Sequence, residues 1–437
     1  MTVRTWPAAA FGSSLLCLLA SCSTGADRYQ RDYVSDGLVA LNGHGLGPGD
    51  GSLPPGVDAT DGLGEEEAVA TALWNNPTFQ AALAELGLRR ADLVVAGELP
   101  NPWLWFLFPV DAKPIAYNVR IPFESLWQRP GRVAAARFDC ERAAQLLMQG
   151  GLDLERDVRL AYAELRLARA RHTLSVQRAE VQRAIGQFTA QRLGAGDASE
   201  LEVSVAGAAV ARADAEAIRT EQALALAESR VRSLVGDGVP LDVELIEGET
   251  ELQPPELAEA PPFEVARERR PDLHGAQLAL EAAGERVGLS RAQIVQAQLL
   301  GDFKYSGAAF QGGPGVFFTV PIFNQGQGGT MRAKADLQQA MLRHHALAQQ
   351  IDFEVRDAHT RLTTAARLAD VCWRALPPLQ QAVQRAEQAW QNGDQARLPV
   401  LEARLSLLDA KLQDAAARAE VARATAELRR NIGGRLQ

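Results

Sequence analysis

The side chain with the clearest chemistry near the start of the chain is Cys22, which follows the small residues Ala20 and Ser21 at the end of an apolar run. An early positive charge at Arg4, an apolar stretch and then small residues form the order of a secretory signal. A cysteine directly after the small residues resembles the lipoprotein variant of such a signal, in which the thiol is acylated and the chain is cut just before it. We therefore predict a signal peptide over 1–21 and a lipid anchor on Cys22. The alternative is an ordinary signal peptide with an accidental cysteine.

The other reactive side chains form no pattern that is typical of catalysis or metal binding. The six histidines are scattered, and His344 and His345 are adjacent, so they point in different directions around a helix. No glycine-rich phosphate loop, Gly-x-Ser-x-Gly turn or metal-ligand spacing is present. We expect neither enzyme activity nor a cofactor nor a metal site. Whether Cys140 and Cys372, each alone in helical sequence, form a disulfide stays open.

The charge of the chain argues against nucleic acid as a partner. The net charge is -9, and basic residues are interspersed with acidic ones instead of forming one stripe. After the signal, no run of about 18 apolar residues occurs, so we expect no membrane-spanning helix. A segment of this chain that crosses a membrane would have to be a strand.

The chain repeats itself at an offset of about 197 residues. This separation relates the dipeptide Gly196-Asp197 to Gly393-Asp394, and it also pairs Val158 with Val355, Leu165 with Leu362, Leu201 with Leu398 and Gly236 with Gly433. Small shifts of the offset between blocks indicate a tandem duplication with insertions in the joints. We predict an acylated linker over 22–64, repeats over 65–236 and 263–437, and a connector over 237–262.

Each repeat is predicted to have the same order of elements. An alanine-rich helical stretch with an early proline comes first, at Ala68 to Gly97 and at Phe263 to Gln298. Two short runs rich in aromatic and β-branched residues follow and indicate a β-hairpin: Trp103 to Val110 with Tyr117 to Phe123, and Leu299 to Ser306 with Val316 to Phe323. Two long helices joined by a Gly-Asp turn complete each repeat: Val133 to Leu193 with Ser199 to Val235, and Ala333 to Asn392 with Ala396 to Ile432.

Two features of these elements suggest how they assemble. Apolar residues at intervals of seven in the first long helix, such as Leu160, Leu167 and Leu174, favour coiled-coil packing. Four strands are too few to close a barrel with an open interior, so a membrane barrel would be shared by several chains. Six aromatic residues are candidates for its lipid-facing surface: Trp103, Trp105, Phe106, Phe108, Phe317 and Phe318. The alternative is that these strands form the core of a soluble domain.

The ordered set of motifs resembles the TolC-like outer-membrane efflux family. The resemblance rests on Arg270-Pro271-Asp272-Leu273, on Val320-Pro321-Ile322-Phe323, and on the turn from Arg192 to Val203. It implies a mainly α fold with a small β part, in which a homotrimer forms an α-helical tunnel below a shared twelve-stranded barrel. It also implies a passive efflux duct in the outer membrane that works with a periplasmic adaptor and an inner-membrane pump. Cys22 resembles the acylated cysteine of many members.

In that family, the tunnel closes where the helix turns converge and acidic side chains ring the opening. The matching candidates are Asp197, Glu200 and Glu202 in the first turn, and Asp394 and Glu402 in the second. Threefold repetition of an acid would attract cations. For Asp197 and Asp394 we favour helix capping. Because Pro399 replaces Glu202 and Ala396 replaces Ser199 in the second repeat, the two turns are not equivalent.

Two other functions compete with the channel. A lipid-anchored periplasmic scaffold without a pore would use the same coiled-coil helices and the same anchor, but it would not need aromatic strand pairs at matching positions in both repeats. An anchored hydrolase would need a nucleophile and a base in a catalytic motif, which the sequence does not show. The transported substrate and the identity of the pump and adaptor stay open.

Overall fold

The computed structural model describes residues 24–58, 62–108, 115–236, 260–306 and 309–435. Cys22, the end of the first predicted strand run with the residues that follow it, 109–114, and most of the predicted connector, 237–259, lie outside these residues. The described chain forms two compact units, one made of 24–34, 81–148 and 271–349, and the other made of 35–80, 149–270 and 350–435. Each is described by itself below.

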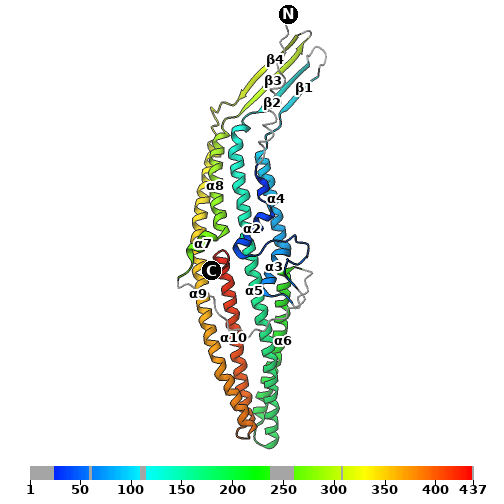
Figure 1. The fold of residues 1–437 in the computed structure, drawn as a ribbon, viewed down its shortest axis with the longest axis vertical. Coiled ribbons are helices and arrows are strands. Elements are labelled where there is room, and N and C mark those ends of the chain that lie inside the picture. The colour runs from blue at the N-terminus through cyan, green and yellow to red at the C-terminus, as the bar shows by residue number, and fades with distance from the viewer. Residues whose placement is uncertain (1–23, 59–61, 109–114, 237–259, 307–308, 436–437) are drawn as a thin grey trace. The chain divides into compact units, whose positions relative to one another are not determined.

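The observed elements occur in the same order in both halves of the chain (Figure 1). A 3₁₀ turn, η1 (Ala26–Arg28), and α2 (Arg31–Asn42) come first. The first half then contains α3 (Glu65–Asn75), α4 (Pro77–Gly97), β1 (Trp103–Leu107), β2 (Ile115–Pro122), α5 (Ser125–Ala195) and α6 (Glu200–Val235). The second contains α7 (Phe263–Arg269), α8 (Pro271–Ala292), β3 (Ala297–Ser306), β4 (Ala309–Phe318), α9 (Gln327–Gln391) and α10 (Arg397–Asn431). The predicted mainly helical fold with two hairpins is confirmed.

The first unit contains an antiparallel sheet with the strand order β1-β2-β3-β4. Because side chains alternate between the faces of a strand and register partners share a face, the pairing assigns every residue to one face. Charged side chains are absent from one face, here called the apolar face, whose members include Leu104, Phe106, Ile115, Tyr117, Val119, Ile121, Leu299, Phe303, Tyr305, Phe310, Val316 and Phe318. The other, here called the polar face, includes Trp103, Trp105, Asn118, Arg120, Gln298, Asp302, Lys304, Gln311 and Phe317.

Because of this alternation, the aromatic residues predicted to form one lipid-facing surface lie on two different faces of the sheet. Phe106 and Phe318 lie on the apolar face, but Trp103, Trp105 and Phe317 lie on the polar face with the charged residues. The sequence suggested one surface because aromatic residues are consecutive in both runs, whereas a strand separates neighbours. On the apolar face, the rings of four strands form a row: Phe106 and Tyr117 have centroids 6.0 Å apart, Tyr117 and Phe303 4.9 Å, and Phe303 and Phe310 5.6 Å.

Strand β4 also differs from its predicted position. The sequence placed a turn at Gln311 to Pro314 and the strand at Val316 to Phe323, but β4 starts at Ala309 and runs through the glycines. Gly312 is needed for packing, because a Cβ there would lie 2.5 Å from Cδ1 of Phe303 and 2.6 Å from the carbonyl oxygen of Asp302. Gly312 therefore makes room for the Phe303 ring and does not form a turn.

The helical core of the second unit follows the sequence repeat. Val158 on α5 and Val355 on α9 are 1% and 0% exposed, and the equivalent pair Leu165 and Leu362 is 1% and 0% exposed. Other equivalent positions, Ala161 with Ala358 and Ala168 with Ala365, are also buried. Small alanines at these positions allow close helix contacts, and matching burial is the expected result of a duplicated packing surface.

The segment before α3 differs from the predicted extended linker. It contains α2, and Leu38, Leu46 and Leu63 are buried. The glycine-rich stretch is held against α3, since Trp74 Nε1 donates to Ser52 Oγ at 3.1 Å and the Cβ of a larger residue at Gly47 would overlap the Trp74 ring. Because these three leucines are buried, the segment packs against the helices and is not an extended linker.

Within the described residues, no helix combines the length and apolarity needed to cross a membrane. Cys140 and Cys372 are both free thiols. Burial raises the pKa of the Cys140 thiol to about 11, which keeps it protonated and unreactive at neutral pH.

Candidate gate at the helix turns

The turn between α5 and α6 depends on a glycine in the left-handed region. Gly196 has a φ of +84°, which glycine adopts without a Cβ penalty. This conformation lets the Asp197 N–H donate to the Arg192 carbonyl at 2.8 Å, and the Arg192 guanidinium in turn donates to the Asp197 carbonyl at 2.6 Å. The Asp197 side chain is exposed beyond this closed turn.

Ser199 caps the next helix, and this corrects the predicted role of Asp197. The Ser199 N–H donates to Glu202 Oε2 at 2.7 Å, and the Glu202 N–H donates to Ser199 Oγ at 3.2 Å. This is a capping box, in which serine and glutamate satisfy each other's backbone donors. The hydrogen bond from the Ser199 backbone, followed by that from its hydroxyl, lowers the pKa of Glu202. Glu202 therefore stays ionised and is held at its own turn.

The turn between α9 and α10 has the same glycine but lacks the cap. Gly393 has a φ of +80°, and the Asp394 N–H donates to the Ala389 carbonyl at 2.8 Å. The N-cap residue is Ala396, which makes no side-chain cap bond, and Pro399 stands where the capping glutamate would be. Asp394 is therefore not the cap either, and the second turn has fewer bonds that fix it.

The five acidic candidates are all exposed, and all belong to the second unit. Glu202 is engaged with Ser199, whereas no ion pair of Asp197, Glu200, Asp394 or Glu402 occurs among the residues that the structure describes. Within one chain, the structure does not bring these carboxylates into one cluster. Glu402 lies five residues into α10, and its carboxylate is free to interact with groups outside its own turn.

Arginine and carboxylate pairs above the turns connect the long helices. Arg183 on α5 binds Asp214 on α6 at 2.8 Å, and Arg404 on α10 binds Glu387 on α9 at 2.7 Å. A further pair, Arg178 with Asp409, joins α5 to α10 and therefore joins the two hairpins. These side chains are about half exposed, and each pair contributes little to stability by itself. The sequence alone does not reveal these pairs, because the partners are distant in sequence.

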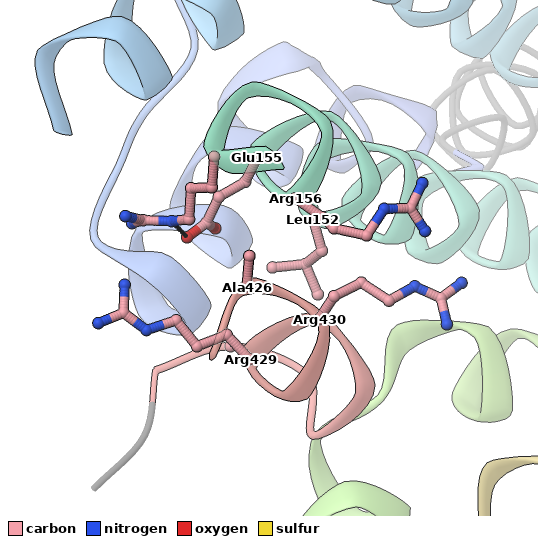
Figure 2. Close-up of a pocket in the computed structure, with 8 residues that line it drawn as sticks. Leu152, Glu155, Arg156, Ala426, Arg429 and Arg430 are labelled. Atoms are coloured by element: carbon pink, nitrogen blue, oxygen red, sulfur yellow. Dashed lines mark hydrogen bonds and ion pairs between the residues drawn. The ribbon is translucent and has the colours of Figure 1, made fainter. Parts of the chain in front are cut away.

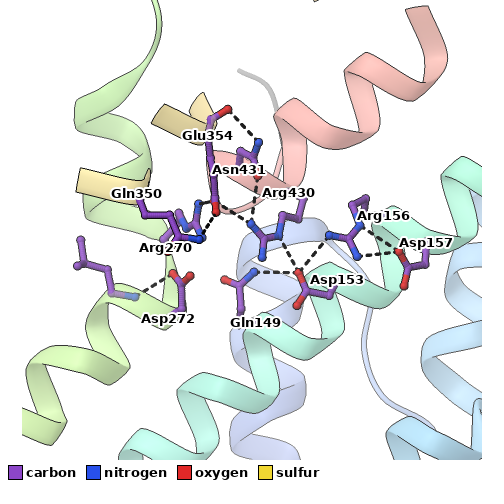
Figure 3. A network of polar contacts seen from close by, with 11 residues as sticks. Gln149, Asp153, Arg156, Asp157, Arg270, Asp272, Gln350, Glu354, Arg430 and Asn431 are labelled. Atoms are coloured by element: carbon purple, nitrogen blue, oxygen red, sulfur yellow. Dashed lines mark hydrogen bonds and ion pairs between the residues drawn. The ribbon is translucent and has the colours of Figure 1, made fainter. Parts of the chain in front are cut away.

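A second polar network lies in the same unit but away from the turns (Figure 3). Arg270, only 1% exposed, binds Glu354 at 2.5 Å, and Glu354 also accepts from Arg430 at 3.0 Å. Arg430 continues to Asp153 at 2.7 Å. Burial opposes the charge on Glu354, but the Arg270 hydrogen bond and positive charge lower its pKa. The network thereby joins the end of α7 to α5, α9 and α10.

Arg159 on α5 is the centre of a further group of ion pairs in the second unit. It is 6% exposed and binds Glu155 at 2.9 Å, Glu65 at 3.0 Å and Glu66 at 2.8 Å. His44 lies 3.2 Å from Glu66, and its hydrogen bond, with those of Arg159, lowers the pKa of Glu66.

A shallow depression lies between α5 and α10 beside this centre (Figure 2). Its lining is formed by Leu152, Glu155, Arg156, Arg159, Ala426, Arg429, Arg430 and Gly434. The four arginines pair with neighbouring carboxylates, so their positive charge is already balanced. Among the described residues, no group of three or more metal-ligating side chains is arranged around a metal position. The arginines that line the depression are part of the ion-pair networks described above.

Comparison with solved structures shows the fold of outer-membrane channels. A CusC structure described for transmembrane channel formation has 20% identity and a TM-score of 0.70, covering 89% of this chain and 96% of that one. The outer membrane protein VceC from Vibrio cholerae has 20% identity and a TM-score of 0.68, covering 85% and 96%. The open state of the MtrE outer membrane channel from Neisseria gonorrhoeae has 16% identity and a TM-score of 0.69, covering 85% and 89%.

No curated protein is significantly similar to the chain in sequence. A family model, however, does match the chain. The model of the family described as "Outer membrane efflux protein" matches residues 110–237 and 263–434, which together form more than half of the chain and correspond to most of the two predicted repeats. The chain belongs to the outer membrane efflux protein family.

Proposed function

We propose that three copies of this chain form the outer-membrane channel of a tripartite efflux system, a passive duct for substrates delivered by an inner-membrane pump through a periplasmic adaptor. The observation that carries this proposal is the sheet, which has one uncharged face and one face with charged residues. A barrel strand in a membrane needs lipid-facing and lumen-facing residues in alternation. Strand β4, with ten residues, has the length that a tilted membrane strand needs.

Sharing a barrel between chains accounts for the edges of the sheet. Within the described residues, β1 and β4 each pair on one side only. In lipid, unpaired backbone groups at such edges cost several kcal/mol each. If β1 of one copy pairs with β4 of the next, three copies give twelve strands and leave no edge.

Glu402 is the strongest candidate for the gate in this assembly. It is exposed beside the uncapped turn, and its carboxylate is not used within the described part of its own chain. Threefold repetition would place three carboxylates around the periplasmic opening, where they would favour cations. Glu202 is the weaker candidate because its carboxylate completes the capping box. Asp197, Glu200 and Asp394 would add to the negative potential of the same end.

The lipid anchor on Cys22 belongs to this proposal. One acyl chain binds membranes weakly, whereas several chains anchor firmly. The mature protein should therefore begin at Cys22 and carry the mass of added acyl groups. Intact mass spectrometry of the membrane-extracted protein measures this directly. A mature protein without added acyl mass at this residue would contradict the anchor but not the channel.

The experiment that tests the channel is planar-bilayer conductance of the solubilised mature protein, together with its native mass. We expect trimers that pass small, cation-preferring currents. Glu402→Gln should reduce the cation preference by about half or more, because it removes the whole proposed ring. Glu202→Gln should have a smaller effect, and Glu221→Gln, an exposed glutamate far along α6, should have none. A correctly acylated monomer that never conducts would support the anchored scaffold instead.

A further inference from the structure

Two tryptophans of β1 lie on the face of the sheet where the charged residues are. Trp103 and Trp105 are 74% and 54% exposed, and their register partners on β2 are Arg120 and Asn118. Tryptophans of membrane strands usually lie on the lipid-facing side, at the level of the headgroups. In this sheet the apolar face is the one suited to lipid. The two indole rings lie on the opposite, polar face, so contact with lipid headgroups does not account for them.

The neighbouring arginine has a charge that is not balanced within the sheet. Arg120 is the register partner of Trp103 and is exposed. Lys304 and Asp302 on the same face pair with each other at 3.8 Å, but Arg120 forms no ion pair in the part of the chain that the structure describes. The patch formed by Trp103, Trp105 and Arg120 therefore combines two exposed rings with one available guanidinium group.

The rest of the polar face leaves this patch uncovered. Along the row of Trp105, the β4 position is Gly313, and along the row of Trp103 it is Gly315. A Cβ on Gly313 would meet no atom within 4 Å, and one on Gly315 would meet only Leu300 at 3.7 Å. A ligand that reaches this face from the open side meets no side chain at these two positions.

We infer that the patch of Trp103, Trp105 and Arg120 is a recognition site for aromatic organic anions that pass through the channel. An aromatic ring stacks on indole, and a carboxylate or sulfonate pairs with the guanidinium group. The inference rests on the proposed channel, in which the polar face lines the lumen. Three copies would then bring six indole rings and three guanidinium groups to one level of the lumen. Rings of arginine are a known basis for anion preference in pores.

The test is block of single-channel current by naphthalene-2-sulfonate, compared with the cation 1-naphthylmethylammonium. We expect the sulfonate to block the channel at lower concentration than the cation does. Trp103→Ala, Trp105→Ala and Arg120→Gln should each raise the half-blocking concentration of the sulfonate by about tenfold. Leu104→Ala is the matched control, because Leu104 lies between the two tryptophans but on the apolar face. It should leave the block unchanged.

The outcomes separate the patch from the channel. A conducting trimer that the sulfonate blocks equally in the wild type and all three patch variants would overturn the inference and leave the channel intact. Equal block by the cation would overturn the role of Arg120. If no current is seen, the proposed channel fails, and equilibrium dialysis of naphthalene-2-sulfonate against the folded, detergent-solubilised protein tests the patch alone. Binding that the patch variants lose would support the site, and unchanged binding would overturn it.

Discussion

At the scale of single residues, the difference between the two helix turns is one of capping. Ser199 and Glu202 satisfy backbone donors at the start of α6, whereas Ala396 and Pro399 offer no such bonds at the start of α10. An N-cap serine is worth on the order of 1 kcal/mol to its helix. The start of α10 should therefore open more readily than the start of α6.

Hydrogen exchange of backbone amides measures this difference. Ser199→Ala should speed exchange in the first turn of α6 by about fivefold, the effect of a lost N-cap. Ala396→Ser is the reciprocal variant and should slow exchange in the first turn of α10, although less, because Pro399 has no N–H to donate. Exchange at both turns that does not respond to either variant would show that capping does not control their stability.

The sequence predicted where the turns are, but not which residues hold them. The Gly-Asp pairs at the repeat offset located both turns, and the replacement of Ser199 by Ala396 showed that they differ. Aspartate after glycine suggests a cap, but the N-cap of α6 is Ser199, three residues after the left-handed Gly196. Pairs such as Arg183 with Asp214 depend on how two helices align and cannot be read from one helix.

At the scale of elements, Gly312 controls the packing of β3 against β4. A Cβ there would contact the Asp302 carbonyl oxygen at 2.6 Å and the Phe303 Cα at 2.9 Å, both backbone atoms that cannot rotate away. Gly312→Val should therefore disturb the pairing of the two strands and reduce the yield of assembled protein in the membrane several-fold. Gly313→Val is the matched control, since its Cβ would meet open space.

The measurement is the fraction of heat-modifiable oligomer in membrane extracts on a denaturing gel. Equal loss of oligomer in both variants would show that any side chain in the glycine run is harmful, and that contact with Phe303 is not the cause. Equal yield in both would show that the strands accommodate the extra atoms.

Helices were more predictable from the sequence than strands were. Long helical stretches separated by Gly-Asp located α5, α6, α9 and α10 to within a few residues, apart from earlier starts for α5 and α9. Strand β4 was displaced because glycine normally indicates a turn, whereas here it makes space for a ring from the neighbouring strand. Strand pairing is a long-range property, so the face of each aromatic residue emerged only from the register.

At the scale of the whole molecule, the tandem repeat explains why buried charges lie where helices of both halves meet. The Arg270 network contacts α5 from the first half and α9 and α10 from the second, within one unit. Removing one partner of a buried ion pair leaves the other uncompensated, at a cost of about 3 kcal/mol. Glu354→Gln should therefore lower the free energy of unfolding by about this amount at pH 7.

The effect of Glu354→Gln should depend on pH in a defined direction. The folded protein lowers the pKa of Glu354 below its ordinary value of 4.5, because Arg270 and Arg430 outweigh the effect of burial. A carboxyl group with a lowered pKa stabilises the fold above its ordinary pKa, and this contribution is lost as the pH falls through the folded value. The Tm difference between wild type and Glu354→Gln should thus be large at pH 7 and shrink toward pH 3.

Thermal unfolding followed by circular dichroism measures this, with Glu221→Gln, an exposed glutamate, as the control that should show little difference at either pH. A Tm difference that stays constant from pH 7 to pH 3 would mean that the ionised form of Glu354 does not hold these helices together.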